Sequence, residues 1–294
     1  MSKRLLLSCK DLDIMRITKI ATLASSVIGA SALLLSATPA AADVLTFATF
    51  SSITPIKNIR FVNSGTATSR TTDAQIYTTS TAGATSVGAT QVHFSFLQTG
   101  LSSFITNVVA DYTLNATVER GDTALSVSGY VIQPIVTGTM SFKSTSAITL
   151  MSPYFAPTTF QAGANLLTVT FSTGLAGTRN SSSSTLSGST GGGALVEFTS
   201  DFLNFDDVDD ADLSTTFSAM TSPLQILNPG NRSLTSFRAT AGGQFSSDPA
   251  PMVLGIVPEP ASWVMMVVGF GMLGIAVRRH PQVARIPLLI AAPL

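Results

Sequence analysis

The chain of 294 residues carries 16 basic and 16 acidic residues, and its only cysteine is Cys9. From Asp43 to Ile256 the count is eight basic against 13 acidic residues, whereas binding to a nucleic-acid backbone requires clustered Lys and Arg. The charge pattern therefore argues against a nucleic-acid partner, and the length allows one or two domains.

Residues 1–42 have the pattern of a secretory signal peptide. A helical, Ala-rich apolar run over 20–35 follows two basic residues, and three alanines end the segment. We expect signal peptidase to cleave after Ala42, with Ala40 and Ala42 in its two small subsites. Met15 is an alternative start, because the stretch before it is long for a signal and contains two aspartates. An uncleaved N-terminal anchor is the other interpretation.

The position of Cys9 before the cleavage point leaves the mature chain without a thiol. That chain can form no disulfide, no cysteine-ligated metal site and no cysteine nucleophile. A domain of about 200 residues can fold on its hydrophobic core without such crosslinks.

Alternation of apolar and polar residues dominates residues 43–245. Within 108–118, the even positions are apolar or tyrosine, and the odd positions from 111 to 117 are polar. Strands with one apolar and one polar face pack as antiparallel layers with water outside. We therefore predict an all-β fold, an antiparallel β-sandwich of roughly 8–12 strands, of which a jelly roll is one form. Similar runs occur at 92–96, 125–131, 167–171 and 194–198.

Residues 180–193, NSSSSTLSGSTGGG, form a low-complexity segment of serine, threonine and glycine. Because it has almost nothing apolar to bury, we predict a mobile loop between two strands. A domain boundary at this point is the alternative, although each half would be small.

An acidic segment follows, and clustered carboxylates are ligands that Ca²⁺ accepts. The alternating aspartates and the glycine of an EF-hand loop are absent, so a solvated acidic turn is the preferred interpretation and a calcium site the weaker one. No other cofactor is indicated. The five acidic residues are Asp206, Asp207, Asp209, Asp210 and Asp212.

Patterns typical of catalysis are sparse in the body. His93 is its single histidine, and it contains no Gly-x-Ser-x-Gly elbow. Asp111, Glu119 and Glu197 are nominal carboxylates for glycoside hydrolysis, which needs a pair at a defined separation. We predict a non-enzymatic body. Tyr130, on a polar strand face, is the best single residue for stacking on a sugar ring.

The C-terminal region carries a second apolar run. Prolines at positions 249, 251 and 258 predict an extended stalk over 246–257. The uncharged run 261–277 has the minimum length of a single transmembrane helix, and Arg278 and Arg279 favour a cytoplasmic position for its end. Prolines on both sides hold Glu259 in an extended peptide outside the bilayer. A buried core helix is the alternative to a membrane span.

The stretch 258–279 resembles the PEP-CTERM sorting signal in its PEPxxWA form. Val264 departs from the usual alanine after the tryptophan, and an atypical apolar tail continues over 280–294. The positions that match, in order, are Pro258-Glu259-Pro260, Trp263, Met265-Met266, Gly269-Phe270-Gly271, Gly274 and Arg278-Arg279.

The resemblance implies an envelope protein of a Gram-negative bacterium. Its C-terminal helix would anchor the protein in the inner membrane with a periplasmic body, before transfer to the cell surface or extracellular matrix. The implied processing partner is an exosortase, a membrane-embedded cysteine transpeptidase that cuts at the Pro-Glu-Pro motif. Such proteins accompany exopolysaccharide and biofilm systems. We therefore expect a non-catalytic structural or adhesive role, with a carbohydrate-binding protein or secreted glycan hydrolase as the alternative.

Overall fold

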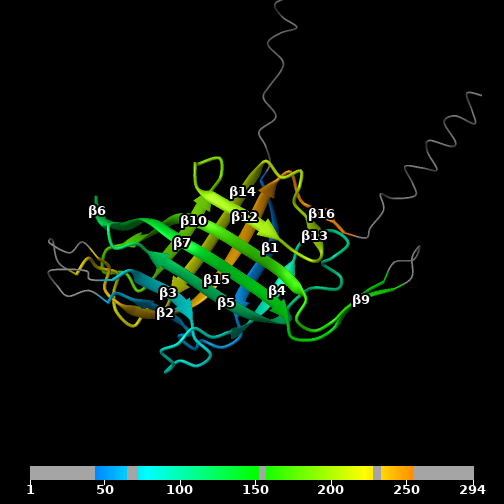
Figure 1. The fold of residues 1–294 in the computed structure, drawn as a ribbon, viewed down its shortest axis with the longest axis horizontal. Coiled ribbons are helices and arrows are strands. Elements are labelled where there is room, and N and C mark those ends of the chain that lie inside the picture. The colour runs from blue at the N-terminus through cyan, green and yellow to red at the C-terminus, as the bar shows by residue number, and fades with distance from the viewer. Residues whose placement is uncertain (1–43, 65–71, 152–156, 228–232, 255–294) are drawn as a thin grey trace, which may run out of the picture. The chain divides into compact units, whose positions relative to one another are not determined.

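A computed structural model describes residues 44–64, 72–151, 157–227 and 233–254 (Figure 1). The predicted signal peptide, transmembrane helix, sorting signal and tail lie outside these ranges. The chain divides into units 1–44 and 45–294, and the fold described below belongs to the second unit. Its regular elements within the described ranges are all β-strands, which confirms the predicted all-β class.

The strands are, in chain order, β1 (Leu45–Ser52), β2 (Ile59–Val62), β3 (Ala74–Thr78), β4 (Thr90–Phe96), β5 (Val108–Val118), β6 (Leu125–Val127), β7 (Tyr130–Ser144), β8 (Ile148–Leu150), β9 (Thr158–Phe160), β10 (Asn165–Thr178), β11 (Ser184–Ser189), β12 (Leu195–Thr199), β13 (Leu203–Asn204), β14 (Asp210–Ser218), β15 (Phe237–Asp248) and β16 (Met252–Val253).

The main sheet closes on itself. From β1, hydrogen-bonded neighbours lead through β4, β5, β7, β10, β11 and β14 to β15, which pairs with β1 again. Each of these pairings is antiparallel, and the order round the sheet is the order along the chain. The hairpin of β2 and β3 forms a second link, because β2 pairs with β15 and β3 pairs with β5. In addition, β6 pairs with β7 and β12 pairs with β10.

Two apolar walls face each other as in the predicted sandwich, but both belong to this one closed sheet. The strand order is also that of a meander, so the jelly-roll form of the prediction is wrong. Alternation determines which side chains point inward, and it is the same for packed sheets and for a closed one. It does not determine which strands pair.

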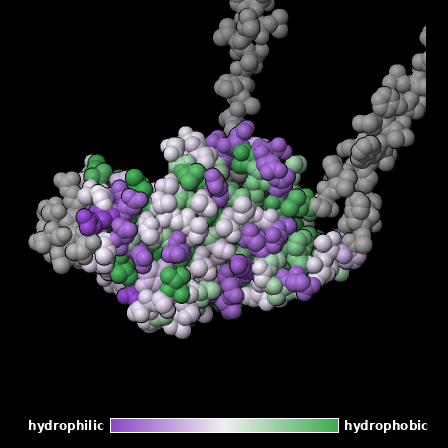
Figure 2. Space-filling view, viewed as in Figure 1, coloured by the Kyte–Doolittle hydropathy of each residue, from purple (hydrophilic) through white to green (hydrophobic). Residues whose placement is uncertain are grey.

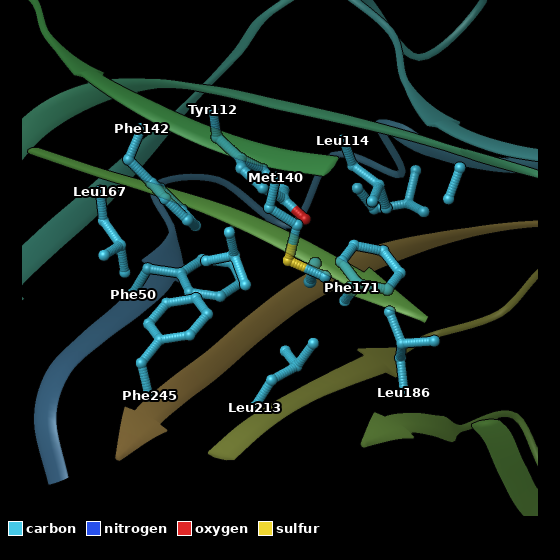
Figure 3. Close-up of a cluster of buried hydrophobic side chains, with 14 of the residues drawn as sticks. Phe50, Tyr112, Leu114, Met140, Phe142, Leu167, Phe171, Leu186, Leu213 and Phe245 are labelled. Carbon is cyan, nitrogen blue, oxygen red and sulfur yellow. The ribbon is translucent and has the colours of Figure 1, made fainter. Parts of the chain in front are cut away.

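Aromatic rings from both walls meet in the core (Figure 3). Tyr112 of β5 and Phe142 of β7 stack with centroids 4.8 Å apart and an interplanar angle of 12°. Phe50 of β1 lies 4.8 Å from Phe142, and Phe245 of β15 lies 5.6 Å from it. Burying each such ring stabilises the fold by roughly 1.5–3 kcal/mol. Tyr112, which alternation places on the apolar face, is fully buried.

Polar residues separate the apolar ones on the outer surface. In the face shown by Figure 2, strongly hydrophobic residues form small separate groups among hydrophilic and neutral ones. The pairing of β5 with β7 brings the strands so close at Gly138 that a Cβ there would lie 2.3 Å from the Ala116 Cβ. Glycine is therefore required at this position of the wall.

The low-complexity segment 180–193 contains a strand of the closed sheet, so the prediction of a loop is wrong. β11 pairs with β10 on one edge and β14 on the other, and its Leu186 is fully buried. A Cβ at Gly188 would lie 2.2 Å from the Thr173 Oγ1, so the small residue permits a close strand contact. The small side chains of β11 therefore allow close pairing on both of its edges, and Leu186 is its contribution to the hydrophobic core.

Candidate functional site

The described chain ends at Leu254, where it is still attached to the body. β16 pairs with β13, and the backbone N–H of Leu254 donates to the Phe202 carbonyl at 2.9 Å. Before β16, Pro251 is buried and its carbonyl accepts a hydrogen bond from Gln98 Nε2. These contacts fix the point from which the C-terminal region leaves.

The predicted stalk over 246–257 is therefore wrong for residues 246–254. Ser246 and Ser247 belong to β15 and are buried, and the following residues form the β16 attachment. Prolines remove backbone donors and restrict the chain, but they do not prevent side chains from packing. Only four residue steps separate Leu254 from Pro258, and four extended residues reach at most about 14 Å.

The five aspartates of the predicted calcium segment lie around this exit but do not converge. Asp206 forms a local turn, its N–H donating to Asn204 Oδ1 at 2.8 Å. Asp210 faces Asp248 across β14 and β15 and accepts from Thr190 Oγ1 at 3.3 Å. Within the described ranges, no three acidic or histidine side chains are arranged to hold a metal ion.

The carboxylates considered for glycoside hydrolysis are also far apart. Asp111 lies on β5 and Glu197 on β12, and β7 and β10 lie between these strands. The residue of β5 that is in register with Glu197 is Asn115, four residues along the strand from Asp111. Strand spacing and rise place the two carboxylates about 20 Å apart. Glycosidase pairs lie roughly 5–9.5 Å apart. Glu119 follows the far end of β5 and is no closer.

Two aromatic predictions concern the outer surface. His93 is half-buried on the polar side of β4, with its Nδ1 3.3 Å from the Asn107 carbonyl oxygen. Tyr130 at the start of β7 is 55% exposed, and Val127 of β6 is its strand partner. Val127 also lines a cavity of about 380 Å³ that the sequence did not predict, together with Ala124, Leu125, Ser126, Val131, Arg179 and Ile226.

Comparison with known proteins concerns the segment just after the exit. The family model of the PEP-CTERM protein-sorting motif matches residues 257–279. Residues 257–279 are a PEP-CTERM sorting motif. The motif marks the protein for export and for membrane-associated sorting in a Gram-negative bacterium, with an exosortase as its processing partner. Searches of curated proteins and of solved structures found no match to the chain.

The residues that carry the sorting motif lie outside the described ranges, so their individual roles stay predictions. The same holds for the cleavage residues Ala40 and Ala42. The described part of the chain contains no apolar helix long enough to cross a membrane. The motif residues in question are Pro258, Glu259, Pro260, Trp263, Arg278 and Arg279.

Proposed function

We propose that this protein is a non-catalytic structural or adhesive component of the cell envelope or extracellular matrix, associated with exopolysaccharide. The PEP-CTERM motif at 257–279 carries the proposal, because it assigns the protein to exosortase-dependent sorting. The wide separation of Asp111 and Glu197 supports a non-catalytic body, since hydrolysis of a glycosidic bond needs two carboxylates flanking that bond.

The proposed route has two membrane steps. Signal peptidase releases the N-terminus after Ala42, and the apolar run 261–277 holds the protein in the inner membrane with its body in the periplasm. Arg278 and Arg279 keep the end of that run in the cytoplasm. Exosortase then cuts at Pro258–Pro260 and transfers the body to the surface or matrix.

Deleting residues 258–279 tests this route. The variant should appear unprocessed in the periplasm or medium, because it lacks both the motif and the anchor. The double substitution of Val267→Leu and Val268→Leu is the matched control, since it preserves the apolar character of the run and changes no position that matches the sorting signal, and it should leave processing unchanged. Membrane retention and tail processing that survive the deletion would refute exosortase sorting.

A carbohydrate-binding role is the second proposal, and one observation favours it. Exposed Tyr130 lies beside the cavity lined by Val127 and Arg179, which combines an aromatic ring, an apolar wall and a cationic hydrogen-bond donor. Glycan arrays and hydrolysis assays on the mature protein distinguish the roles. Binding of a defined glycan that Tyr130→Ala abolishes would establish the carbohydrate-binding role, and turnover would overturn the non-catalytic one.

A further inference from the structure

Two arginines lie directly opposite each other on neighbouring strands. Arg60 of β2 and Arg238 of β15 are Cα partners in the antiparallel pairing. Their strand neighbours Phe61 and Phe237 are buried and stack at 5.3 Å, so both arginine side chains point to the outer face of the sheet. Directly opposite residues have Cβ atoms about 5 Å apart, and like charges in such a pair repel.

Neither guanidinium has a full set of acceptors. Arg238 Nη2 donates to the carbonyls of Ala84 at 2.8 Å and Gly83 at 3.4 Å, but its buried Nη1 has no partner. Arg60 Nη1 is also buried without an acceptor. Among the described residues, no carboxylate pairs with either guanidinium. Buried donors and charges without partners are costly, so this arrangement needs an explanation.

The segment 80–88 covers the arginine pair from outside. Tyr77, the strand partner of Arg60 on β3, is only 5% exposed, and its hydroxyl donates to the Thr85 carbonyl at 2.8 Å. Gly83 and Ala84 supply the carbonyls that Arg238 contacts. The hydrogen bonds of this segment with Arg238 are through backbone carbonyls, and the segment contains no acidic residue that could neutralise either arginine.

We propose that Arg60 and Arg238 bind one oxyanion, a carboxylate, sulfate or phosphate group. The planar guanidinium fork matches such groups in geometry and charge. The oxyanion supplies acceptors to both Nη1 atoms and compensates the repulsion between the arginines. Because these Nη1 atoms are covered, entry of an anion requires the segment 80–88 to move its carbonyls outward. The site does not depend on the sorting motif or on the cavity beside Tyr130.

Thermal unfolding of the mature protein tests the site, with sulfate titrated against chloride at constant ionic strength. Sulfate should raise the unfolding midpoint saturably, because it binds only the folded state. Arg60→Met and Arg238→Met should each raise the half-saturating sulfate concentration at least about tenfold, the effect of one lost charge-assisted hydrogen bond. Lys143→Met removes one positive charge from an exposed position outside both proposed binding sites and should leave the sulfate response unchanged.

The order of stability of the parent and the variants should also differ between chloride and sulfate. In chloride alone, Arg60→Met should be at least as stable as the parent, because it removes repulsion and an unpaired donor; in saturating sulfate it should be less stable. Arg60→Lys, which keeps the charge but not the fork, should fall between them. A parent that shows no saturable response, or variants that respond like the parent, would overturn the proposal.

An oligomer of uronic acid, compared with a neutral oligosaccharide of equal length, distinguishes the two sources of the anion. Stabilisation by both sulfate and the uronate oligomer, lost in Arg60→Met, would assign the site to acidic groups on a polymer. Stabilisation by sulfate alone would assign it to free inorganic anions. Each result supports the oxyanion site, whereas equal stabilisation by the neutral oligosaccharide would contradict it.

Discussion

The two ends of the closed sheet differ in charge and in connection to the rest of the chain. At one end, Leu45 at the start of β1 opposes Ser247, and β16 follows β15, so the first and last described strands lie there. Seven aspartates between 201 and 248 surround this exit. The other end carries β2, β3 and β6, and it has a nearly balanced charge, with Arg60, Arg120, Arg179 and Arg238 against Asp73, Glu119 and Asp122. The ten residue steps from Arg238 to Asp248 extend about 33 Å along β15, which separates the two ends.

Under the two proposals, the sorting motif lies beyond one end of the sheet and the oxyanion site lies at the other. The exit end is followed within a few residues by the sorting motif, so under the proposed anchoring it faces the membrane. The arginine end then points away from the membrane, where dissolved ligands or a matrix polymer can reach it.

The largest expected effect is the loss of stability when a buried side chain at the exit end is removed. Phe202, fully buried, packs against Phe96 and Phe160, and its carbonyl holds Leu254. Phe202→Ala should lower the free energy of unfolding by about 3–5 kcal/mol, measured by urea denaturation. Val127→Ala at the arginine end is the control, because Val127 is 53% exposed, and it should stay within about 0.5 kcal/mol. Equal losses would show that the two ends are packed alike.

A middle-sized effect concerns the core that both ends share. The hydroxyl of Tyr112 is buried without a partner, and burial raises its pKa. Tyr112→Phe should stabilise the protein by about 1–2 kcal/mol, since it removes an unsatisfied polar group.

The same substitution changes the pH dependence. In the parent, the unfolded chain loses the Tyr112 proton above its ordinary pKa of about 10, while the folded state keeps it. The contribution of Tyr112 to the parent's free energy of unfolding should therefore be constant below about pH 10 and decrease above it. The free energy of unfolding of Tyr112→Phe should decrease less steeply above that pH. Parallel alkaline curves for the two proteins would contradict this assignment.

The smallest expected effect compares the like-charge pairs at the two ends. Asp210→Asn relieves the repulsion between Asp210 and Asp248 and should add about 0.2–1 kcal/mol at low salt, with the gain shrinking at high salt. Chemical denaturation at two ionic strengths measures it. Sulfate in place of chloride should not alter this gain, in contrast to Arg60→Met. A sulfate-dependent gain for Asp210→Asn would remove the distinction between the ends.

Sequence patterns predicted the parts of the fold that depend on local chemistry. Alternation placed Tyr112 inside and His93 on the polar face, because the two-residue period of a strand decides which way a side chain points. It could not predict closure, because closure depends on β15 pairing with β1, the strand at the opposite end of the body. Serine and proline content misled the prediction at β11 and β16, where neighbouring strands override composition.

The functional features divide in the same way. The sorting motif is contiguous, so its residues could be recognised in order along the chain. Arg60 and Arg238 are far apart in sequence, and only the register of β2 on β15 makes them partners. Neither residue stands in a recognisable motif, and the missing acceptors become visible only once the surrounding backbone is in place.

The position of β15 has a mechanical consequence. A load applied through the C-terminal end first acts on β16, whose two residue pairs with β13 can peel apart one after the other. The load then reaches β15, which β14 holds along one edge and β1 and β2 hold along the other. In a protein tethered at this end, a pulling force would therefore first separate β16 from β13 and lengthen the chain by a few residues. Further extension would require breaking the hydrogen bonds of β15 to its neighbours in the closed sheet.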